Sequence, residues 1–589
     1  MKIDELQQVG KVLSPQVLGR LWEAGAFDPR AAMGAVRSLP WLVGRGPSLG
    51  VLAQINATAY GDRAAVHDSK GSLSWKELDG RTNRLARALE ASGVRSGDRV
   101  ATLLRNGREA IEAIYASHKL GVAVAPLNTW GRTRELKHAV EQSKPTVLVY
   151  DVRHASALRP AVGDDIRLVA VEAGKDALDG SVDYESFLED QSDGPLRPVS
   201  LDRSPPKILI HTSGTTGKAK AASRGTPLGA ILSLLGLFSI VPYRRSDVIL
   251  CPPPLFHAFG LLTFTLAGLL GAPLVLPEKF DPEETLTLID RHDVTAMSLV
   301  PVMVRRILDL PDEVKSKFDL DTLRIILVSG SVLPDEVRGE AMAMFGEIVY
   351  DLYGSTEAGW VAVATPEDMQ EAPGTVGKPV PGVDVAAFGE DRTKQAPREK
   401  GTLAVKSGMV FEGYASGEDT ETFDGYLSIG DSGWVDEEGR LFVEGRTDEM
   451  VVIGGENVYP VEVESVIEGM DGVRDVAVVG IPDQEYGQVL AAFVEGSVDQ
   501  EQVVKYSRDN LASFKVPKVV EVVDELPRTS TGKVRKNQLL EKRDRGKKRN
   551  GEQGGSNPKG KTKSKAKSSS AAKSTQGARR DGKKQSDAG

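Results

Sequence analysis

The stretch "KILIHTSGTTGKAK", residues 207–220, places a short apolar run directly before a loop of Ser, Thr, Gly and Lys. The apolar run predicts a buried strand. In the loop, glycines let backbone N–H groups approach an anion closely, and hydroxyl groups add further donors. A strand followed by such a loop indicates a phosphate site in an α/β fold, although a flexible connector would have a similar composition.

This loop differs from two common nucleotide-binding motifs. The P-loop of NTPases needs four residues between its glycines and a Ser or Thr after the Lys. Here only two residues separate Gly214 from Gly217, and Ala219 follows Lys218. The first strand is not followed by a GxGxxG either. The sequence therefore argues against an ordinary P-loop and against a dinucleotide-binding turn.

Helical and strand-like patterns alternate on both sides of the loop, from about residue 46 to residue 365. Apolar spacing predicts helices in "SWKELDGRTNRLARALEASG" and "REAIEAIYASHKLG", and strands in "RVATLL" and "VAVAPLN". The starts "PEE" and "PD", at residues 282–284 and 334–335, place Pro and acids in the first turn of two helices. Such alternation is typical of parallel sheets covered by helices.

The pattern changes after about residue 373, where short strands lie between Gly and Pro turns, and again after Arg446, where a small α+β unit begins. We therefore expect an α/β fold with a large N-terminal domain of parallel, helix-covered sheets, a β-rich subdomain, a hinge and a small α+β C-terminal domain. The predicted divisions are an N-terminal helical extension without strong caps (1–45), the large domain (46–445), the small domain (446–541) and a disordered basic tail (542–589).

Composition narrows the class of protein. The chain has 589 residues, of which 40% are hydrophobic and 27% charged, as in ordinary globular proteins. Its single cysteine, Cys251, argues against a disulfide framework or a Cys-based zinc site and fits a reducing compartment. The first residues, "MKIDELQQVG", lack the apolar core of a secretory signal. These features predict a cytoplasmic protein.

Two uncharged stretches, residues 225–243 and 259–277, are about as long as a membrane-spanning helix of ~20 residues. Gly271 and Pro273 interrupt the second, which favours a buried helix followed by a strand. The first begins just after the phosphate-like loop, which needs an aqueous site. We therefore expect buried α/β layers and a soluble protein.

The net charge of −9 conceals a basic tail. Residues 542–589 contain 16 Lys or Arg and 4 Asp or Glu, so the rest of the chain is strongly acidic. The tail has too few apolar residues to bury a core. A solvated appendage is one interpretation. Contact with nucleic acid or with anionic lipid at the inner face of the membrane is another.

Three more motifs follow the loop: "YGSTEAG" (353–359), "IGDSGWVDEEGRLFVEGRTDEMVVIGGENVYPVEVE" (429–464) and "PRTSTGKVRK" (527–536). With these motifs in this order, the chain resembles the superfamily of adenylate-forming enzymes, which includes acyl-CoA synthetases, luciferases and the adenylation domains of peptide synthetases. The resemblance extends over about residues 75–540.

The resemblance implies a nucleotide site. The family loop holds the β- and γ-phosphates of ATP, and Mg²⁺ takes carboxylate oxygen together with phosphates. One departure is that Lys218-Ala219-Lys220-Ala221 stands where the family usually has Gly-x-Pro-Lys-Gly. The implied ATP or AMP contacts are Thr212, Ser213, Gly214, Thr215, Thr216, Gly217, Lys220, Gly330, Ser331, Tyr353, Gly354, Ser355, Thr356, Asp431, Arg446 and Lys533, and the implied Mg²⁺ ligands are Glu357 and Thr215.

Individual roles follow from the same resemblance. The ring of Tyr353 would stack on adenine, Asp431 would accept from the ribose hydroxyls, and Arg446 would donate to the ribose. Turn formation alone would also account for the Tyr-Gly and Gly-Asp pairs. Lys533, together with Glu357 and Thr215, is the predicted catalytic group, since its ammonium would offset the charge that gathers when a carboxylate attacks the α-phosphate. A solvated lysine in a basic C-terminus is the alternative.

Two further sets complete the prediction. Asp448 is the expected hinge, and Gly454, Gly455 and Asn457 would line the path of CoA. In "PPPLFHAFG", residues 252–260, the resemblance assigns Phe256, His257 and Gly260 to the acid pocket, where an Asp that would hold an amino acid is missing. His257 could equally be a core histidine.

The sequence thus predicts an ATP-dependent fatty-acid–CoA ligase for medium to long chains, with ATP, Mg²⁺ and CoA as cofactors and co-substrates. Alternatives are a fatty acyl-AMP ligase that loads a carrier protein, a ligase for aryl or other acids, and a module that binds nucleic acid or a membrane surface through its basic tail. The oligomeric state is open, with a homodimer among the options.

Overall fold

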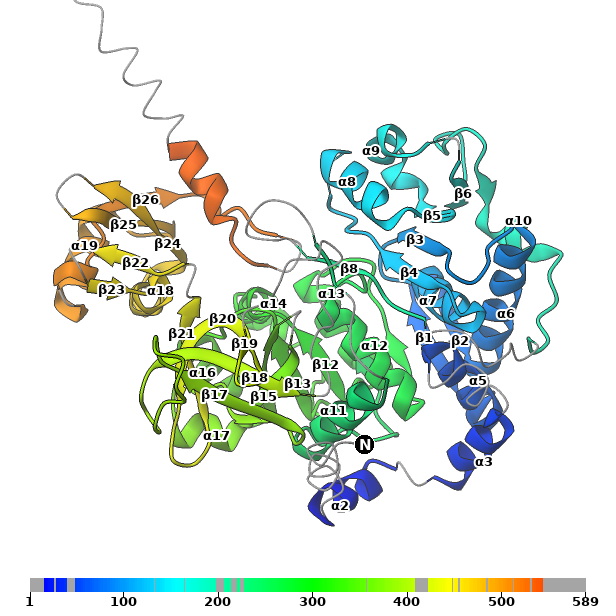
Figure 1. The fold of residues 1–589 in the computed structure, drawn as a ribbon, viewed down its shortest axis with the longest axis horizontal. Coiled ribbons are helices and arrows are strands. Elements are labelled where there is room, and N and C mark those ends of the chain that lie inside the picture. Colours follow the sequence, from blue (N-terminus) through cyan, green and yellow to red (C-terminus); the bar gives the residue numbers. More distant parts are fainter. Residues whose placement is uncertain are drawn as a thin grey trace, which may run out of the picture. The chain divides into compact units, whose positions relative to one another are not determined.

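The computed structural model describes residues 15–25, 28–39, 48–131, 133–163, 165–196, 206–212, 220–222, 227–355, 358–407, 422–446, 449–453, 456–483, 486–511, 513–529 and 532–543. The chain divides into two compact units, residues 1–536 and 537–589. All the elements below lie in the first unit (Figure 1). The predicted limits of the domains are not tested by this division and stay a prediction.

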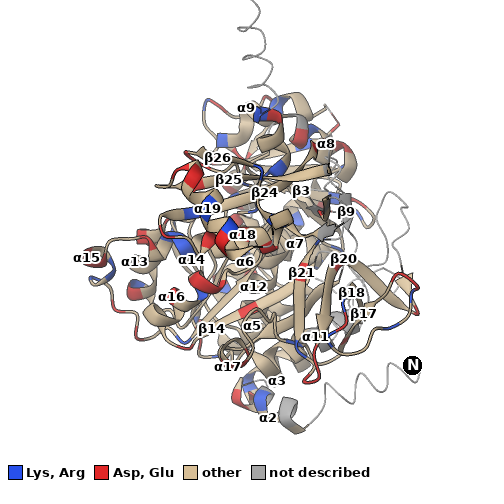
Figure 2. Cartoon of the chain, turned by 90° about the vertical axis from the view of Figure 1, so that its left-hand side faces the viewer, with Lys and Arg blue, Asp and Glu red and all other residues tan. Residues whose placement is uncertain are grey.

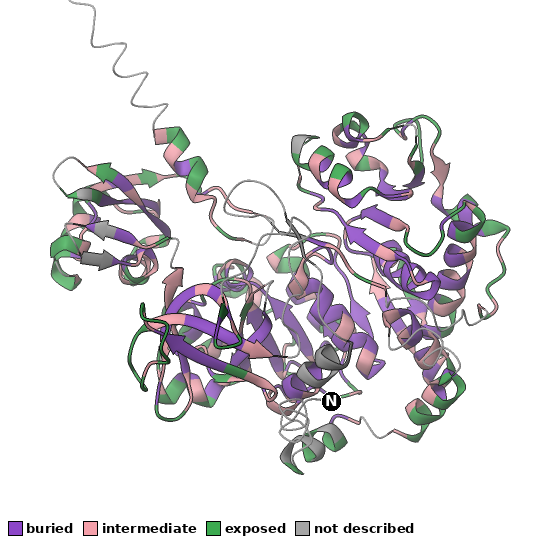
Figure 3. Cartoon of the chain, in the orientation of Figure 1, coloured by how far each residue is buried: buried purple, intermediate pink, exposed green. Residues whose placement is uncertain are grey.

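The first sheet is wholly parallel, with strand order β4-β3-β5-β6-β7. Its strands are buried along most of their length, as Figure 3 shows, which explains their runs of Val, Leu and Ala. The strands are β3 (Arg99–Leu103), β4 (Ala123–Pro126), β5 (Val147–Asp151), β6 (Arg167–Val171) and β7 (Val182–Asp183). The helices between them are α7 (Arg108–Leu120), α8 (Thr133–Ser143) and α9 (Ala155–Leu158), with 3-10 turns η1 (Val152–His154) and η2 (Arg159–Ala161), and α10 (Tyr184–Glu189) follows β7.

The second sheet has nine strands in the order β16-β15-β14-β13-β12-β10-β11-β1-β2. Its central strands are parallel, and β2, β15 and β16 at the edges are antiparallel. The strands are β1 (Ala64–Asp68), β2 (Gly71–Ser74), β10 (Ile249–Leu250), β11 (Leu274–Val275), β12 (Ala296–Leu299), β13 (Ile325–Ser329), β14 (Val349–Ser355), β15 (Gly359–Ala364) and β16 (Lys378–Pro379). The associated helices are α5 (Leu49–Tyr60), α6 (Trp75–Ala91), α11 (Pro227–Ile240), α12 (Ala258–Leu270), α13 (Pro282–His292), α14 (Pro301–Leu308), α15 (Asp312–Lys315), α16 (Asp335–Phe345) and α17 (Pro366–Glu371).

The β-rich segment forms an antiparallel sheet in the order β17-β18-β20-β19, with β21 also paired to β20. After it come a two-stranded hairpin and a three-stranded sheet with two helices. The strands are β17 (Val383–Phe388), β18 (Gly401–Ser407), β19 (Thr422–Phe423), β20 (Tyr426–Val435), β21 (Leu441–Arg446), β22 (Val451–Ile453), β23 (Glu456–Val458), β24 (Val473–Asp483), β25 (Gly487–Gly496) and β26 (Val519–Val523). The helices are α18 (Pro460–Glu468), α19 (Gln500–Asn510) and η3 (Ser513–Lys515).

The predicted fold class is confirmed, and so are most of the quoted segments. The helix predicted before residue 271 is α12, and it ends where Gly271 takes φ +64, the left-handed conformation that glycine adopts at helix ends. The strand β11 follows it. None of the helices in the described part of the chain is long and apolar enough to cross a membrane. Charged side chains lie mainly on helices and loops rather than on strands (Figure 2).

Two local predictions were wrong. The N-terminal extension forms α2 (Pro15–Glu23) and α3 (Pro29–Arg37) among its described residues, and α3 is well capped, because the Asp28 carboxylate accepts from the backbone N–H of Arg30 at 2.7 Å. In α16, Pro334 is the N-cap residue and not part of the first turn, which begins at Asp335. The sequence places Pro and acids near a helix start, but the exact boundary depends on backbone angles.

Candidate functional site

Three side chains of the predicted nucleotide site come together from two sheets. Tyr353 lies in β14, Asp431 in β20 and Arg446 in β21, where Asp431 and Arg446 are direct partners across the ladder. The Tyr353 hydroxyl donates to one carboxylate oxygen of Asp431, and Arg446 Nη1 lies 3.7 Å from the other. Arg446 also donates to the carbonyl of Ile429 at 3.3 Å. Residues nearly a hundred positions apart thus form one polar cluster.

The surroundings of Tyr353 in this cluster shift the pKa of its hydroxyl. Burial, together with the negative charge and hydrogen bond of Asp431, raises the pKa of the Tyr353 hydroxyl well above its usual range. Tyr353 therefore stays protonated and remains a donor. Asp431 is largely buried, and its carboxylate accepts from the Tyr353 hydroxyl.

The predicted phosphate loop is the connection of a two-stranded hairpin. β8 (Ile210–Thr212) pairs antiparallel with β9 (Lys220–Ala222), and Thr212 lies directly opposite Lys220. The hairpin extends the first sheet, because the N–H of Leu209 donates to the carbonyl of Val124 in β4 at 2.8 Å. The regular strand starts at Ile210, later than the run "KILI" predicts. The remaining predicted contacts of the loop lie outside the described residues: Ser213, Gly214, Thr215, Thr216 and Gly217.

The motif "YGSTEAG" is split between two strands and their turn. Tyr353 and Ser355 belong to β14, because Ser355 still pairs with Gly359 at the start of β15. Gly354 must be glycine, since a Cβ atom there would lie 2.2 Å from the carbonyl oxygen of Gly359. Thr356 and Glu357 at the tip lie outside the described residues. Both predicted Mg²⁺ ligands, Glu357 and Thr215, therefore stay a prediction.

Gly330 and Ser331 follow β13 on the neighbouring strand. Gly330 has φ +102, a backbone conformation that side-chain-bearing residues rarely adopt, and the Ser331 side chain is exposed. Because β13 and β14 are parallel neighbours, both predicted segments leave the same edge of the sheet. Their placement is consistent with contacts to one ligand, but their roles stay a prediction.

Lys533 stands in a turn with a defined backbone. The N–H of Thr529 donates to the carbonyl of Lys533 at 2.7 Å, and the N–H of Lys533 donates to the Thr529 hydroxyl at 3.1 Å. Gly532 has φ +82, and a Cβ atom on it would lie 2.6 Å from a methyl group of Val302 in α14. The turn therefore packs against the first turn of α14 and presents Lys533 beside the larger sheet.

The predicted acid segment runs into α12. Phe256 is buried, and its ring centroid lies 4.5 Å from that of His257, the N-cap residue of α12. Burial lowers the pKa of the His257 imidazole to about 4, and the positive charge of Lys533 contributes. Two predicted site residues, far apart in sequence, thus lie near each other. Gly260 packs directly on the preceding loop, since a Cβ atom there would lie 2.2 Å from the carbonyl oxygen of Pro254.

Comparisons with known proteins identify the family of the chain. The family model described as "AMP-binding enzyme" matches residues 53–415, and the model "AMP-binding enzyme C-terminal domain" matches residues 462–533. The chain belongs to the AMP-binding enzyme family. The helices α2 and α3 and the basic tail lie outside the two matched ranges.

Relatives of this AMP-binding enzyme act on different acids. The chain is 33% identical to an indoleacetate–CoA ligase of Aromatoleum aromaticum, over 81% of this chain and 94% of that protein. It is 30% identical to a long-chain-fatty-acid–CoA ligase of Mycobacterium tuberculosis, over 80% and 93%. The ATP-bound structure of MatB from Rhodopseudomonas palustris matches with a TM-score of 0.73 and 28% identity, over 84% of this chain and 99% of that one.

The predicted hinge and CoA path are only partly described in this AMP-binding enzyme. Asp448, Gly454 and Gly455 lie outside the described residues, and Asn457 lies in β23 opposite Val452. Glu449 directly follows the predicted hinge residue. Its carboxylate and that of Glu464 each lie 3.1 Å from Lys536 Nζ. These roles stay a prediction.

Proposed function

We propose that this AMP-binding enzyme is an ATP-dependent acid–CoA ligase that activates a medium- or long-chain fatty acid. The observation that carries the proposal is the cluster of Tyr353, Asp431 and Arg446, which brings an aromatic ring, a charged acceptor and a guanidinium to one place. That set can hold an adenosine group by stacking and by hydrogen bonds to its ribose. The indoleacetate and long-chain-fatty-acid relatives are both named as acid–CoA ligases, which supports ligation of an acid to CoA here.

The reaction proceeds in two steps that balance without a redox partner. A carboxylate oxygen of the acid attacks the α-phosphorus of ATP, and the bond to the bridging oxygen breaks, which releases pyrophosphate and leaves acyl-AMP. The thiol of CoA then attacks the acyl carbonyl, and AMP departs. Mg²⁺, when bound, would neutralise phosphate charge, with Glu357 and Thr215 as its proposed ligands.

Within this scheme Lys533 and the acid segment have separate tasks. The ammonium group of Lys533 offsets the charge that develops as two anions meet, and a preorganised donor of this kind typically contributes about 10²–10³ in rate. Phe256 and the apolar helix α12 supply the surface for the acid. Leu261, Leu262 and Phe264 of this helix are buried in the hydrophobic core.

The length of the acid is the finer part of the proposal. Each methylene buried against apolar side chains contributes about 0.8 kcal/mol, which corresponds to about a fourfold fall in KM. A series of straight-chain acids from hexanoate to palmitate should therefore show KM falling about fourfold per added methylene until the pocket is full. An aryl acid is the second candidate, because the indoleacetate–CoA ligase shares 33% of its residues with this chain.

The test measures pyrophosphate release with ATP, Mg²⁺ and a panel of fatty and aryl acids, with and without CoA, and identifies products by mass. Acyl-CoA from fatty acids supports the proposal. If acyl-AMP accumulates even when CoA is present, and the acyl group is transferred to an added carrier protein, the enzyme is instead a fatty acyl-AMP ligase. If no acid releases pyrophosphate, acid activation is wrong, and a binding module that acts through its basic tail becomes the better hypothesis.

A further inference from the structure

The loop that leads into the acid segment has few backbone donors of its own. It contains three consecutive prolines, residues 252–254, between β10 and α12. Proline has no backbone N–H, so these residues donate nothing, while their carbonyl groups still need donors. Most of the loop is buried, where an unpaired carbonyl is costly. The carbonyl of Pro254 accepts from the N–H of His257 at 3.1 Å, and that of Pro253 from the Cys251 thiol at 3.5 Å. Further donors to the loop come from elsewhere in the chain.

Asn106 supplies such a donor from the first sheet. Its amide nitrogen donates to the carbonyl of Cys251 at 3.3 Å and to that of Pro253 at 3.1 Å. Its amide oxygen accepts from the N–H of Leu255 at 2.9 Å. The side chain is 7% exposed, and all three bonds go to one five-residue stretch almost 150 positions further along the chain. Asn106 thus fixes both ends and the middle of the proline loop.

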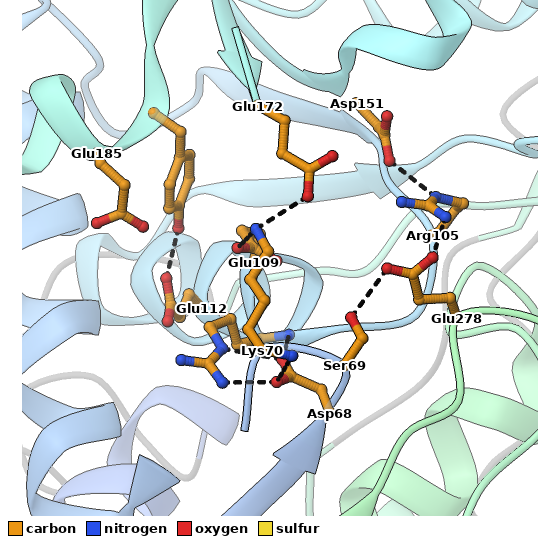
Figure 4. A network of polar contacts seen from close by, with 12 residues as sticks. Asp68, Ser69, Lys70, Arg105, Glu109, Glu112, Asp151, Glu172, Glu185 and Glu278 are labelled. Carbon is orange, nitrogen blue, oxygen red and sulfur yellow. Dashed lines mark hydrogen bonds and ion pairs between the residues drawn. The ribbon is translucent and has the colours of Figure 1, made fainter. Parts of the chain in front are cut away.

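Asn106 is itself held rigidly, because charged contacts anchor the residues around it. Figure 4 shows Arg105 between Asp151 and Glu278. Asp151 is the last residue of β5, and Glu278 lies in the segment after β11. The Arg105 Nε atom lies 2.8 Å from the Asp151 carboxylate. On the other side, Asp68 accepts from the backbone N–H and the guanidinium of Arg108, both at 2.9 Å. The two sheets are therefore joined at the position from which Asn106 extends.

A shift of the proline loop would be passed on directly to the predicted acid pocket. Phe256 and His257 follow Leu255 without a break, and the N–H of His257 donates to the carbonyl of Pro254 at 3.1 Å. The same carbonyl is the one that Gly260 packs against, at the first turn of α12. The loop, the two rings and the start of the helix can therefore move only together.

We propose that Asn106 is a positioning residue for acid binding: its three hydrogen bonds hold the proline loop so that Phe256 and His257 form one wall of the acid pocket. This inference rests on the proposed function, since it assigns the wall to the acid and not to ATP. Asn106 acts through the loop and does not touch the reacting atoms. No sequence pattern points to Asn106, because a single Asn between a strand and a helix is common in turns.

The experiment compares three variants of the full chain. Asn106→Ala removes all three bonds, and Asn106→Asp keeps the size and the acceptor for Leu255 but replaces the donor by an oxygen. Asn56→Ala is the matched control, because Asn56 is also buried and donates at 2.7 Å to the carbonyl of Gly268, near the other end of α12. KM and kcat are measured separately for the acid and for ATP by pyrophosphate release, and folding by circular dichroism.

We expect both Asn106 variants to raise the KM for the acid about 10- to 100-fold, the size of effect that small misplacements in a binding site produce, with the KM for ATP unchanged. Asn56→Ala should lower thermal stability without changing the KM for the acid. An acid KM within about twofold of the wild type in the Asn106 variants would overturn the inference. A parallel rise of both KM values would also overturn it, as would failure of both Asn106 variants to fold while Asn56→Ala folds. If the wild type itself activates no acid, the proposed function fails first, and the inference falls with it.

Discussion

His118 is a buried base whose charge should control stability in mild acid. It lies in α7, is 4% exposed, and neither ring nitrogen has a hydrogen-bond partner among the described residues. Helix α5 packs so closely on this part of α7 that a Cβ atom at Gly50 would lie 2.9 Å from the carbonyl carbon of His118. Small movements therefore cannot bring the ring to water, and burial lowers the pKa of His118 to about 4.

The magnitude follows from the difference between folded and unfolded pKa values. The folded protein favours neutral His118, so its contribution is fully present above the ordinary pKa of 6.5 and is lost as the pH falls towards 4. At about pH 5 the loss is about 2 kcal/mol, and below pH 4 it reaches about 3.4 kcal/mol. Replacing His118 with Leu should remove this loss, and the protein should also gain stability at neutral pH, since no polar ring atoms remain buried.

The assay is urea unfolding of wild type and His118→Leu at about pH 7.5 and pH 5, followed by circular dichroism. The difference between the two proteins isolates His118, because other buried groups titrate equally in both. Glu112 is one of them, since burial raises the pKa of its carboxyl group to about 6, which has the opposite effect on stability. His138, half-buried in α8, provides the control substitution His138→Leu. If His118→Leu loses as much stability between these pH values as the wild type, the buried neutral imidazole is the wrong explanation.

Four further outcomes are expected. Lys533→Ala should lower acyl-adenylate formation about 10²–10³-fold while the thioester step from premade acyl-AMP stays much less affected; equal losses in the two half-reactions refute its role. Asp448→Pro should spare adenylation and slow thioester formation, and normal rates in both steps would contradict the hinge. Tyr353→Phe should lower the free energy of unfolding by about 1.5–3 kcal/mol, because it removes a hydrogen bond to the charged Asp431, and an unchanged urea midpoint would speak against this. Removal of residues 542–589 should leave turnover intact, and loss of turnover would contradict the tail's being a separate appendage; salt-sensitive binding of the full chain to anionic vesicles, or its absence, decides whether the tail contacts lipid.

Part of the candidate site could be predicted from short sequence patterns. Tyr353, Asp431 and Arg446 could be named from short motifs because each lies in a stretch with a distinctive composition. The spacing of apolar residues likewise predicted α6, α7 and α13, and the Gly and Pro positions predicted the break after α12. Boundaries such as the N-cap of α16 and the start of β8 differed by a few residues, because hydrogen bonding with distant strands decides them.

The sequence by itself determined the family, the alternation of helices and strands and the kinds of side chain available for binding a nucleotide. Only the tertiary structure decided which of these side chains meet. The hydrogen bond between Tyr353 and Asp431 joins two different sheets, and Asn106 reaches a proline loop that no local pattern connects to it. The physical reason is that hydrophobic periodicity is a property of neighbours in sequence, whereas the contacts that orient a buried polar group come from elements packed together by the whole fold.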